Sequence, residues 1–442
     1  MTERSAASAA PATAGELGFW SLCALGINGM VGVGIFFAPA EVAALVPGSA
    51  GTWVYALTTL SIAPVAACYA LLGARFAKDG GPFVWAEAAF GSEVAYAVGW
   101  ISFVSALFST AAVVSGLGQY LGPYLGFVGP TSARVFSGLS IVILGAFVAA
   151  GLRLSAFVWN GLTIAKLLPL VALLGLGAAL VWRGAAPAAS PPNPSAVATG
   201  AAPTISWLRA MLVALFATQG FEILPVPSGS IRNRKRNLPL AMLVSLAFVT
   251  LLYMGLHATA VAALPSVASS GAPLVAAARA LGGPRLDYVV SLGTQVSAVG
   301  IAFGMFAMTP RYLAALAGPK GLGDWVGRHS ARNVPLPALL ITLAVSFVLV
   351  LSGQLESLFV LASLAVLGQF AVSLLALCRL AWRRAHGLKR AQLWLALPAL
   401  GSLLLVAHGA ERREFVMLFA SLALGLVLRY LPRRPAPDPK PD

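Results

Sequence analysis

Two ionisable side chains lie inside long apolar stretches of this chain, where they could carry protons. Lys166 lies in TIAKLLPLVALL, and Glu222 lies in LFATQGFEILPVPSG. A charge at membrane depth is costly and usually faces a polar cavity, a partner or a transport pathway. Burial disfavours the ammonium form of a lysine, so Lys166 is a candidate proton-coupling group or a fixed cation in the place of a metal ion. The alternative is a lysine that binds carbonyl oxygens only to hold helices together.

Glu222 belongs to a stretch that is too irregular for a simple helix. The stretch also contains polar residues and helix breakers, namely Gln219, Gly220, Pro225 and Pro227. The carboxylate of Glu222 can carry a proton, or it can anchor a broken helix through hydrogen bonds. Opened backbone here would offer carbonyl oxygens to an ammonium group, and Phe216 could close over the ligand. A proline-kinked helix with ordinary aromatic packing is the alternative.

The other irregular stretch is Leu22–Pro39, LCALGINGMVGVGIFFAP, which is long and apolar enough to span a membrane. Its four glycines are Gly26, Gly29, Gly32 and Gly34. Each glycine costs about 1 kcal/mol against alanine in a helix interior. Either they allow another helix to pack closely, or the helix opens and turns its amides toward an anion such as a carboxylate. Their spacing leaves both interpretations open. Asn28, beside them, could cap a half-helix or bond a neighbouring helix.

The sequence lacks the residue groupings that enzymes and metal proteins use. It contains no nucleophile grouped with a histidine and an acid, no phosphate-binding glycine loop and no clustered His/Cys motif. Cys23, Cys68 and Cys378 lie in or beside apolar runs and are interpreted as small core residues. We therefore expect no enzymatic activity, no metal site and no cofactor, with the proton as the coupling ion.

Composition assigns the chain to the polytopic membrane proteins. Of its 442 residues, 59% are hydrophobic and 10% are charged, against about 25% charged residues in soluble proteins. The formal net charge is +15, but the basic residues lie between apolar runs, as membrane topology demands, so no nucleic-acid partner is expected. Twelve runs are long enough to cross about 30 Å of hydrocarbon. They cover residues 17–38, 51–74, 91–121, 134–151, 155–182, 205–227, 238–264, 286–317, 336–353, 356–380, 391–408 and 415–431.

The first and the sixth runs are the interrupted ones, and each opens a block of five. Interrupted segments at matching places in two halves point to an inverted-repeat transporter with its site at mid-membrane. Basic residues favour the even-numbered connections by roughly three to one, which predicts a multi-pass plasma (inner) membrane protein with cytoplasmic termini. The predicted divisions are a disordered cytoplasmic tail 1–16, a first five-helix repeat 17–182, an extracytoplasmic loop 183–204, a second five-helix repeat 205–380, two additional helices 381–431 and a cytoplasmic tail 432–442.

Five motifs in order give the chain a resemblance to the amino acid–polyamine–organocation superfamily of transporters, and within it to amino acid permeases. GINGMVGVGIFFAP is similar to the family's glycine-rich binding motif, and TIAKLLPL matches its lysine segment. ARFAKDGGPFVWAEAAFG is similar to the segment before the third span, and GFEILPVPSGSIRNRKRNLP to the Gly-Phe-Glu motif with its basic loop. MTPRYLAALAGPKGL is similar to the Pro-Arg stretch after the eighth span. The resemblance covers nearly the whole chain.

The resemblance implies an all-α integral membrane fold of about twelve helices. This fold is a five-plus-five inverted repeat with discontinuous helices 1 and 6, followed by two C-terminal helices. Transport would proceed by alternating access, with an amino acid or related amine held between spans one and six. By position, Lys166 falls on the family lysine that takes the place of a sodium ion in proton-linked members. Together with Glu222 it forms the predicted proton-coupling pair.

The predicted substrate-binding residues come from both interrupted spans. They are Asn28, Met30, Gly32, Val33, Gly34, Phe216, Ala217, Gln219 and Gly220. Carried over from the family by position, Met30, Val33 and Gly34 line the carboxylate side. Phe216, Ala217 and Gln219 meet the amino group and the side chain. Val33 stands where many members have Ser or Thr, so a hydroxyl contact is missing and backbone amides must bind the carboxylate.

We therefore predict a secondary active transporter for amino acids that is coupled to protons. Little charge lies near the predicted cavity, which favours neutral substrates. One alternative is an exchanger that swaps amino acids or amines. Another is a sensor or accessory protein that keeps the fold without net transport. The expected partners are a small-molecule substrate and the lipid bilayer, and the sequence carries no sign of an oligomeric state.

Overall fold

The computed structural model describes residues 17–32, 34–151, 156–182, 204–264, 266–318, 321–352 and 355–430. The predicted tails and nearly all of the predicted loop 183–204 lie outside these residues. The helices of the first half are α1 (Phe19–Met30), α2 (Gly34–Leu45), α3 (Ala50–Arg75), α4 (Pro82–Phe90), α5 (Ser92–Leu121), η1 (Gly122–Leu125), α6 (Pro130–Ala149) and α7 (Ala156–Trp182). Those of the second half are α8 (Thr204–Thr218), η2 (Phe221–Ile223), η3 (Ser228–Ser230), α9 (Arg234–Ala263), α10 (Pro273–Ala314), α11 (Leu336–Ser352), α12 (Leu355–Trp382), η4 (Ala385–Gly387), η5 (Arg390–Gln392), α13 (Leu393–Ala407) and α14 (Arg412–Tyr430).

The fold is all-α, as predicted, and every predicted apolar run coincides with a helix or with the α1–α2 pair. Among the described residues, seven helices are long and apolar enough to cross a membrane, and eight if α1 and α2 form one broken span. The helices α8 and α11 and the apolar part of α7, Lys166–Ala179, are shorter. The described residues therefore form an all-α fold with several membrane-length helices, while the count of twelve spans and the inverted repeat stay predictions.

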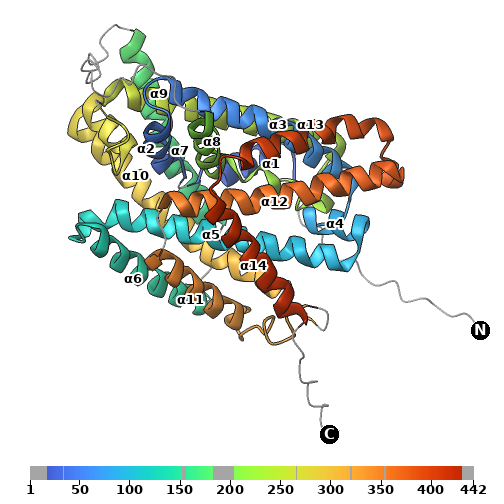
Figure 1. Cartoon of the computed structure of the whole chain (residues 1–442). Coiled ribbons are helices and arrows are strands. Elements are labelled where there is room, and N and C mark those ends of the chain that lie inside the picture. Colours follow the sequence, from blue (N-terminus) through green and yellow to red (C-terminus); the bar gives the residue numbers. More distant parts are fainter. Residues whose placement is uncertain are drawn as a thin grey trace, which may run out of the picture.

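The helices form two groups with a long helix between them (Figure 1). In one group α3 packs on α9 and α8, and α1 packs on α9. In the other group α5 packs on α10, α6 and α11, and α6 lies beside α11. The helix α12 contacts both α5 and α8, and α7 contacts both α9 and α10. Both broken spans therefore belong to the first group, with α12 and α7 at its borders.

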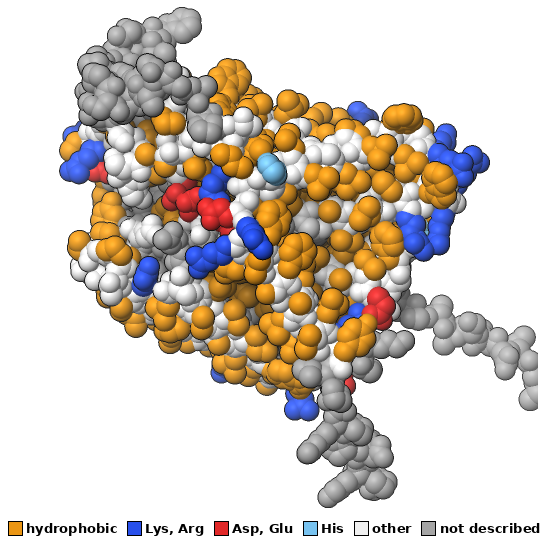
Figure 2. Space-filling view, in the orientation of Figure 1, with side chains coloured by type: hydrophobic (Ala, Val, Ile, Leu, Met, Phe, Trp, Pro, Cys, Tyr) orange, Lys and Arg blue, Asp and Glu red, His pale blue; other side chains and the backbone are white. Residues whose placement is uncertain are grey.

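The outer surface of the helices is strongly apolar, as expected for a protein surrounded by lipid. Hydrophobic side chains cover most of the face in Figure 2, and charged side chains gather in a few places. Large apolar side chains are widely exposed, with Trp394 at 80% and Leu404 at 74% exposure. A soluble monomer rarely exposes so much contiguous apolar surface. The structure thus agrees with composition in assigning the chain to the membrane.

Two helices begin where the sequence predicted connections. The segment before the third span forms α4, which starts at Pro82 after Gly81, whose φ of 50° is left-handed. The eighth span was predicted to begin at residue 286, but α10 already begins at Pro273 and turns at Gly283, where φ is 68°. Both helices start with a proline in the first turn, where the missing N–H has no partner to lose.

The C-terminal pair α13–α14 is attached to both groups of helices. At the turn between these two helices, a side-chain carbon on Gly409 would lie 2.6 Å from the main-chain nitrogen of Arg209 in α8. The helix α14 then crosses α12 and α5 (Figure 1). At its far end the guanidinium of Arg429 donates to Glu93 of α5 at 2.7 Å. The pair therefore links the start of α8 to the start of α5.

Candidate functional site

The first span is broken where the glycine-rich motif predicted a break. The helix α1 ends at Met30, α2 begins at Gly34, and the two are bent by 51°. At the end of α1 the N–H of Val31 donates to Ile27, and the N–H of Gly32 turns back to Met30, both at 2.8 Å. Val33, a predicted carboxylate contact, lies outside the described residues.

The sixth span is broken after Thr218, the last residue of α8. Gly220 has a φ of 122°, which favours glycine over any residue with a side chain. Its N–H donates to the carboxylate of Glu222 at 2.7 Å. The chain then continues through the short 3-10 helices η2 and η3 instead of a second half-helix. Glu222 therefore closes the turn at the break, as the anchoring interpretation of this acid predicts.

The two breaks are in direct contact. A side-chain carbon on Gly220 would collide with the main chain of Gly29, and one on Gly29 would lie 2.6 Å from the Ile223 side chain. On the other side of the break, a side-chain carbon on Gly34 would lie 2.9 Å from Cα of Ala217. Close backbone approach is thus required on both sides of the broken segment.

Gly32 differs from the other glycines of the motif. A side-chain carbon on Gly26 would lie 2.8 Å from the Ser245 hydroxyl, so Gly26 joins Gly29 and Gly34 as a packing glycine. Among the described residues, the same carbon on Gly32 would meet only the Met30 carbonyl oxygen, at 3.9 Å. Each of the two interpretations of the motif therefore applies to different glycines. Three of its glycines allow helices to pack, and Gly32 faces open space.

Lys166 reaches the broken end of α1 from α7. It is 4% exposed, and its ammonium donates to the carbonyl oxygens of Asn28 at 3.0 Å and Val31 at 2.5 Å. The last carbonyls of a helix have no partner within the helix. Lys166 supplies that partner to two of them, and both acceptors are neutral. The lysine that the sequence singled out thus lies against the break itself.

Tyr253 of α9 contacts both breaks, although the sequence did not suggest a role for it. Its hydroxyl lies 2.9 Å from the carbonyl oxygen of Met30 and 3.0 Å from that of Ala217. The side chain is fully buried, and its ring packs edge-on against Tyr55 of α3. A buried tyrosine hydroxyl usually finds a partner. In the sequence, Tyr253 is visible only as a tyrosine within the apolar run 238–264, and the sequence does not identify its partners.

The predicted residues of α8 face α12 and α5. The Phe216 ring stacks on Phe359 of α12, with ring centres 4.3 Å apart. The side-chain amide of Gln219 donates to the Ser109 hydroxyl of α5 at 3.2 Å. The carbonyl oxygen of the Gln219 amide is buried and has no hydrogen-bond partner among the described residues. The break of α8 thus combines an aromatic face with an unused acceptor.

A second charged cluster, which the sequence did not predict, holds the start of α8. Arg209 donates to Glu356 of α12 at 2.6 Å and to both carboxylate oxygens of Glu414 of α14 at 3.1 Å. A third acid, Glu411, lies 3.7 Å from the guanidinium. The side chains of Arg209 and Glu414 are 14% and 4% exposed. This Arg209 cluster joins three helices at the end of the molecule predicted to face outward.

Comparisons with known proteins agree with this geometry. A family model described as amino acid permease matches residues 17–424. An uncharacterised transporter of Mycobacterium tuberculosis is 28% identical over 368 residues, an alignment that covers 81% of this chain and 78% of the relative. Asc-type amino acid transporter 1 of Mus musculus is 27% identical over 382 residues, covering 84% of this chain and 71% of the relative. These relatives are named as transporters, not as enzymes.

Proposed function

Since this chain belongs to the amino acid permease family, we propose that it is a secondary transporter that moves a neutral amino acid by alternating access, coupled to protons. The observation that carries this proposal is the meeting of two broken helices, α1–α2 and α8, whose main chains approach each other directly. Broken helices that meet at mid-membrane are the usual substrate site of such transporters.

The geometry of the breaks supports a site that meets each part of a zwitterion on a different side. The amino end of α2, next to Gly32, offers N–H groups and the positive end of a helix dipole to a carboxylate. Gly32 leaves space there, because no neighbour other than the Met30 carbonyl oxygen would lie within 4 Å of an added side-chain carbon. The Phe216 ring and the free Gln219 acceptor then meet the amino group and the side chain of the substrate.

Charge at the breaks favours a neutral substrate. Of the residues predicted from the sequence, only Lys166 and Glu222 are ionisable, and both already bind main-chain groups of the breaks. A charged substrate side chain at the breaks would therefore find no free opposite charge among these residues. The relative of Mus musculus named as an Asc-type amino acid transporter supports an amino acid as the substrate.

Proton coupling through Lys166 follows from its two neutral acceptors. When protonated, the ammonium joins α7 to the end of α1 through Asn28 and Val31. When the proton leaves, the amine keeps two N–H donors but loses its charge, and these bonds weaken because hydrogen bonds from charged donors are about twice as strong. Protonation therefore sets how firmly α7 holds the broken helix, which links the proton to the position of α1.

The decisive experiment is uptake of labelled amino acids into proteoliposomes, with and without a pH gradient. We expect saturable uptake of a neutral amino acid that an inward proton gradient stimulates. Uptake that depends on amino acid inside the vesicle, and not on the gradient, would identify an exchanger. Binding without any flux would identify a sensor or accessory protein. Folded protein that neither binds nor moves any of the twenty amino acids would refute the proposal.

Gly32 provides a variant that tests the site itself. Gly32→Leu places a side chain in open space, so we expect loss of substrate binding with an unchanged melting temperature. Gly34→Leu is the matched control, because its side chain would press on Ala217 and should lower the melting temperature as well. Binding that survives in Gly32→Leu would place the substrate elsewhere.

Reporter fusions expressed in cells test membrane orientation. We propose a plasma (inner) membrane location with cytoplasmic termini, on the basis of the basic residues between spans. A reporter fused to either end should be active only in the cytoplasm. Activity on the outer side would reverse the orientation and with it the direction in which the proton gradient acts.

A further inference from the structure

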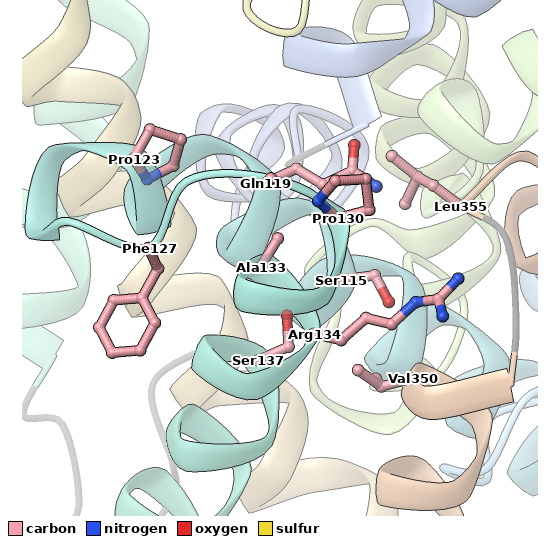
Figure 3. A pocket seen from close by; sticks show the side chains of 11 residues that line it. Ser115, Gln119, Pro123, Phe127, Pro130, Ala133, Arg134, Ser137, Val350 and Leu355 are labelled. Atoms are coloured by element: carbon pink, nitrogen blue, oxygen red, sulfur yellow. The ribbon is translucent and has the colours of Figure 1, made fainter.

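A cavity of about 460 Å³ opens between helices that take no part in the broken segments. It lies at the end of α5, beneath η1 and the loop to α6, and reaches α11 and α12 (Figure 3). None of its lining residues belongs to α1, α2 or α8. Its volume falls in the range of about 300–1,000 Å³ that small-molecule sites occupy. The cavity is therefore separate from the site proposed above and large enough for a ligand.

Three polar side chains in this outer cavity have no hydrogen-bond or ion-pair partner among the described residues. Ser115 is only 9% exposed, yet its hydroxyl lines the cavity unpaired. Gln119, one turn further along α5, and Arg134 of α6 also line the cavity, as does Ser137, whose hydroxyl donates to the Val114 carbonyl oxygen. Figure 3 shows the Arg134 side chain extending beside Ser115, with Val350 below it. Buried polar groups are normally paired, so the unpaired Ser115 hydroxyl indicates a missing partner, while Gln119 and Arg134 are exposed side chains that reach the same cavity.

The charge of the outer cavity favours an anion. Arg134 is always protonated, and it has no carboxylate partner among the described residues. Glu356 follows the lining residue Leu355, but Arg209 already binds its carboxylate at 2.6 Å. Arg134 lies one turn into α6, and Gly129 leaves the amino end of this helix without a side-chain cap. The helix dipole adds positive charge at that end instead of neutralising the guanidinium.

Apart from Gly129 and the paired Ser137, the remaining walls of the cavity are apolar. They are formed by Pro123, Phe127, Pro130, Ala133, Val350 and Leu355. A ligand that fits must therefore present acceptor oxygens to Arg134, Ser115 and Gln119 and an apolar body to the other walls. We propose that this outer cavity binds an anionic head group, a carboxylate or a phosphate, carried on a short apolar chain. Such a ligand can come from the aqueous phase or from a lipid.

The test uses the purified full-length protein in detergent and two probes, sodium hexanoate and dihexanoyl phosphatidylglycerol. Binding is followed by calorimetry and by the rise in melting temperature that a ligand of the folded state produces. We expect at least one probe to bind the wild type, and Arg134→Gln to weaken that binding by about tenfold or more, because a hydrogen-bonded charge is lost. Hexanoate binding identifies a solute, and binding of the phospholipid alone identifies a head group.

Three further measurements keep the proposal falsifiable. Ser115→Leu should fill the outer cavity and abolish binding while Arg134 remains. Arg285→Gln, on the exposed surface of α10, is the matched control and should bind like the wild type, as should Lys166→Ala. Hexylammonium chloride should not bind. Equal probe binding by the wild type and Arg134→Gln, or no binding of either probe, would overturn the proposal whether or not the protein transports amino acids.

Discussion

Two cations, the buried Lys166 and the partly buried Arg209, are held in opposite ways. The ammonium of Lys166 binds two neutral carbonyl oxygens, while the guanidinium of Arg209 lies among three carboxylates. A lysine with neutral acceptors can lose its proton without leaving an unpaired charge behind. An arginine stays protonated in proteins, and its carboxylates would be stranded without it. The comparison separates a group suited to exchanging protons from one suited to fixing the start of α8.

The largest effect is expected at Lys166. Lys166→Ala should reduce the acid-stimulated part of uptake to background, because no titratable group then joins α7 to α1. Lys166→Arg should do the same, since the arginine keeps its charge at every accessible pH. Uptake across a pH series in proteoliposomes measures both variants. An unchanged pH profile in either variant would remove the lysine from the coupling mechanism and end the contrast with Arg209.

Arg209→Gln should act on stability and leave the pH profile of the remaining activity unchanged. The change strands Glu414, which is 4% exposed, and breaking such a buried pair costs about 3 kcal/mol. Thermal unfolding of the purified protein measures the loss. Arg279→Gln is the matched control, because its ion pair with Asp287 is long, at 3.6 Å, and exposed, so the expected change is below about 1 kcal/mol. Equal losses in both variants would contradict the structural role of the cluster.

Tyr253→Phe tests whether neutral donors at the breaks serve the substrate site. The change removes the hydroxyl that contacts Met30 and Ala217, which should cost about 1 kcal/mol of stability and weaken substrate binding severalfold. Tyr69→Phe is the control, because it loses one buried bond to Ser373 at 2.9 Å. We expect a similar change in melting temperature without weaker binding. Equal effects of both variants on binding would show that Tyr253 acts only through general stability.

The smallest effect is expected at the edge of the Arg209 cluster. Glu411 is 66% exposed and 3.7 Å from the guanidinium, so Glu411→Gln should change stability by less than about 0.5 kcal/mol. Glu414→Gln, at the buried end of the same cluster, should cost several times more. Melting temperatures of the two variants at low and high salt test this order. A larger loss for Glu411→Gln would mean that the exposed acid holds the arginine.

The sequence predicted the breaks because helix-breaking residues are visible in a single stretch of chain. Glycines within an apolar run and the Gln219–Pro227 segment each mark a local departure from helix, and the structure bends or opens at both. Lys166 was predicted for the same reason, since a lysine deep in an apolar run has few explanations. Local signals of this kind need no knowledge of the neighbouring helices.

The partners of those breaks could not be predicted, because they come from distant parts of the chain. Arg209 lies more than a hundred residues from both Glu356 and Glu414, and each of the three looks like an ordinary charge at a helix end. Tyr253 is one aromatic among many in apolar runs. The division of the glycines into packing positions and the open Gly32 likewise depends on neighbours from the α8 break and α9. Only packing between helices supplies this information.

Because of the contact at Gly409, a molecule bound to the two C-terminal helices can restrict the movement of α8. The turn between α13 and α14 abuts the main chain of α8 at Arg209, so this end of α8 cannot move far unless the turn moves with it. An antibody fragment or cyclic peptide raised against the turn should therefore arrest the cycle while leaving the substrate path untouched. An inhibitor bound at that surface would not compete with the transported molecule.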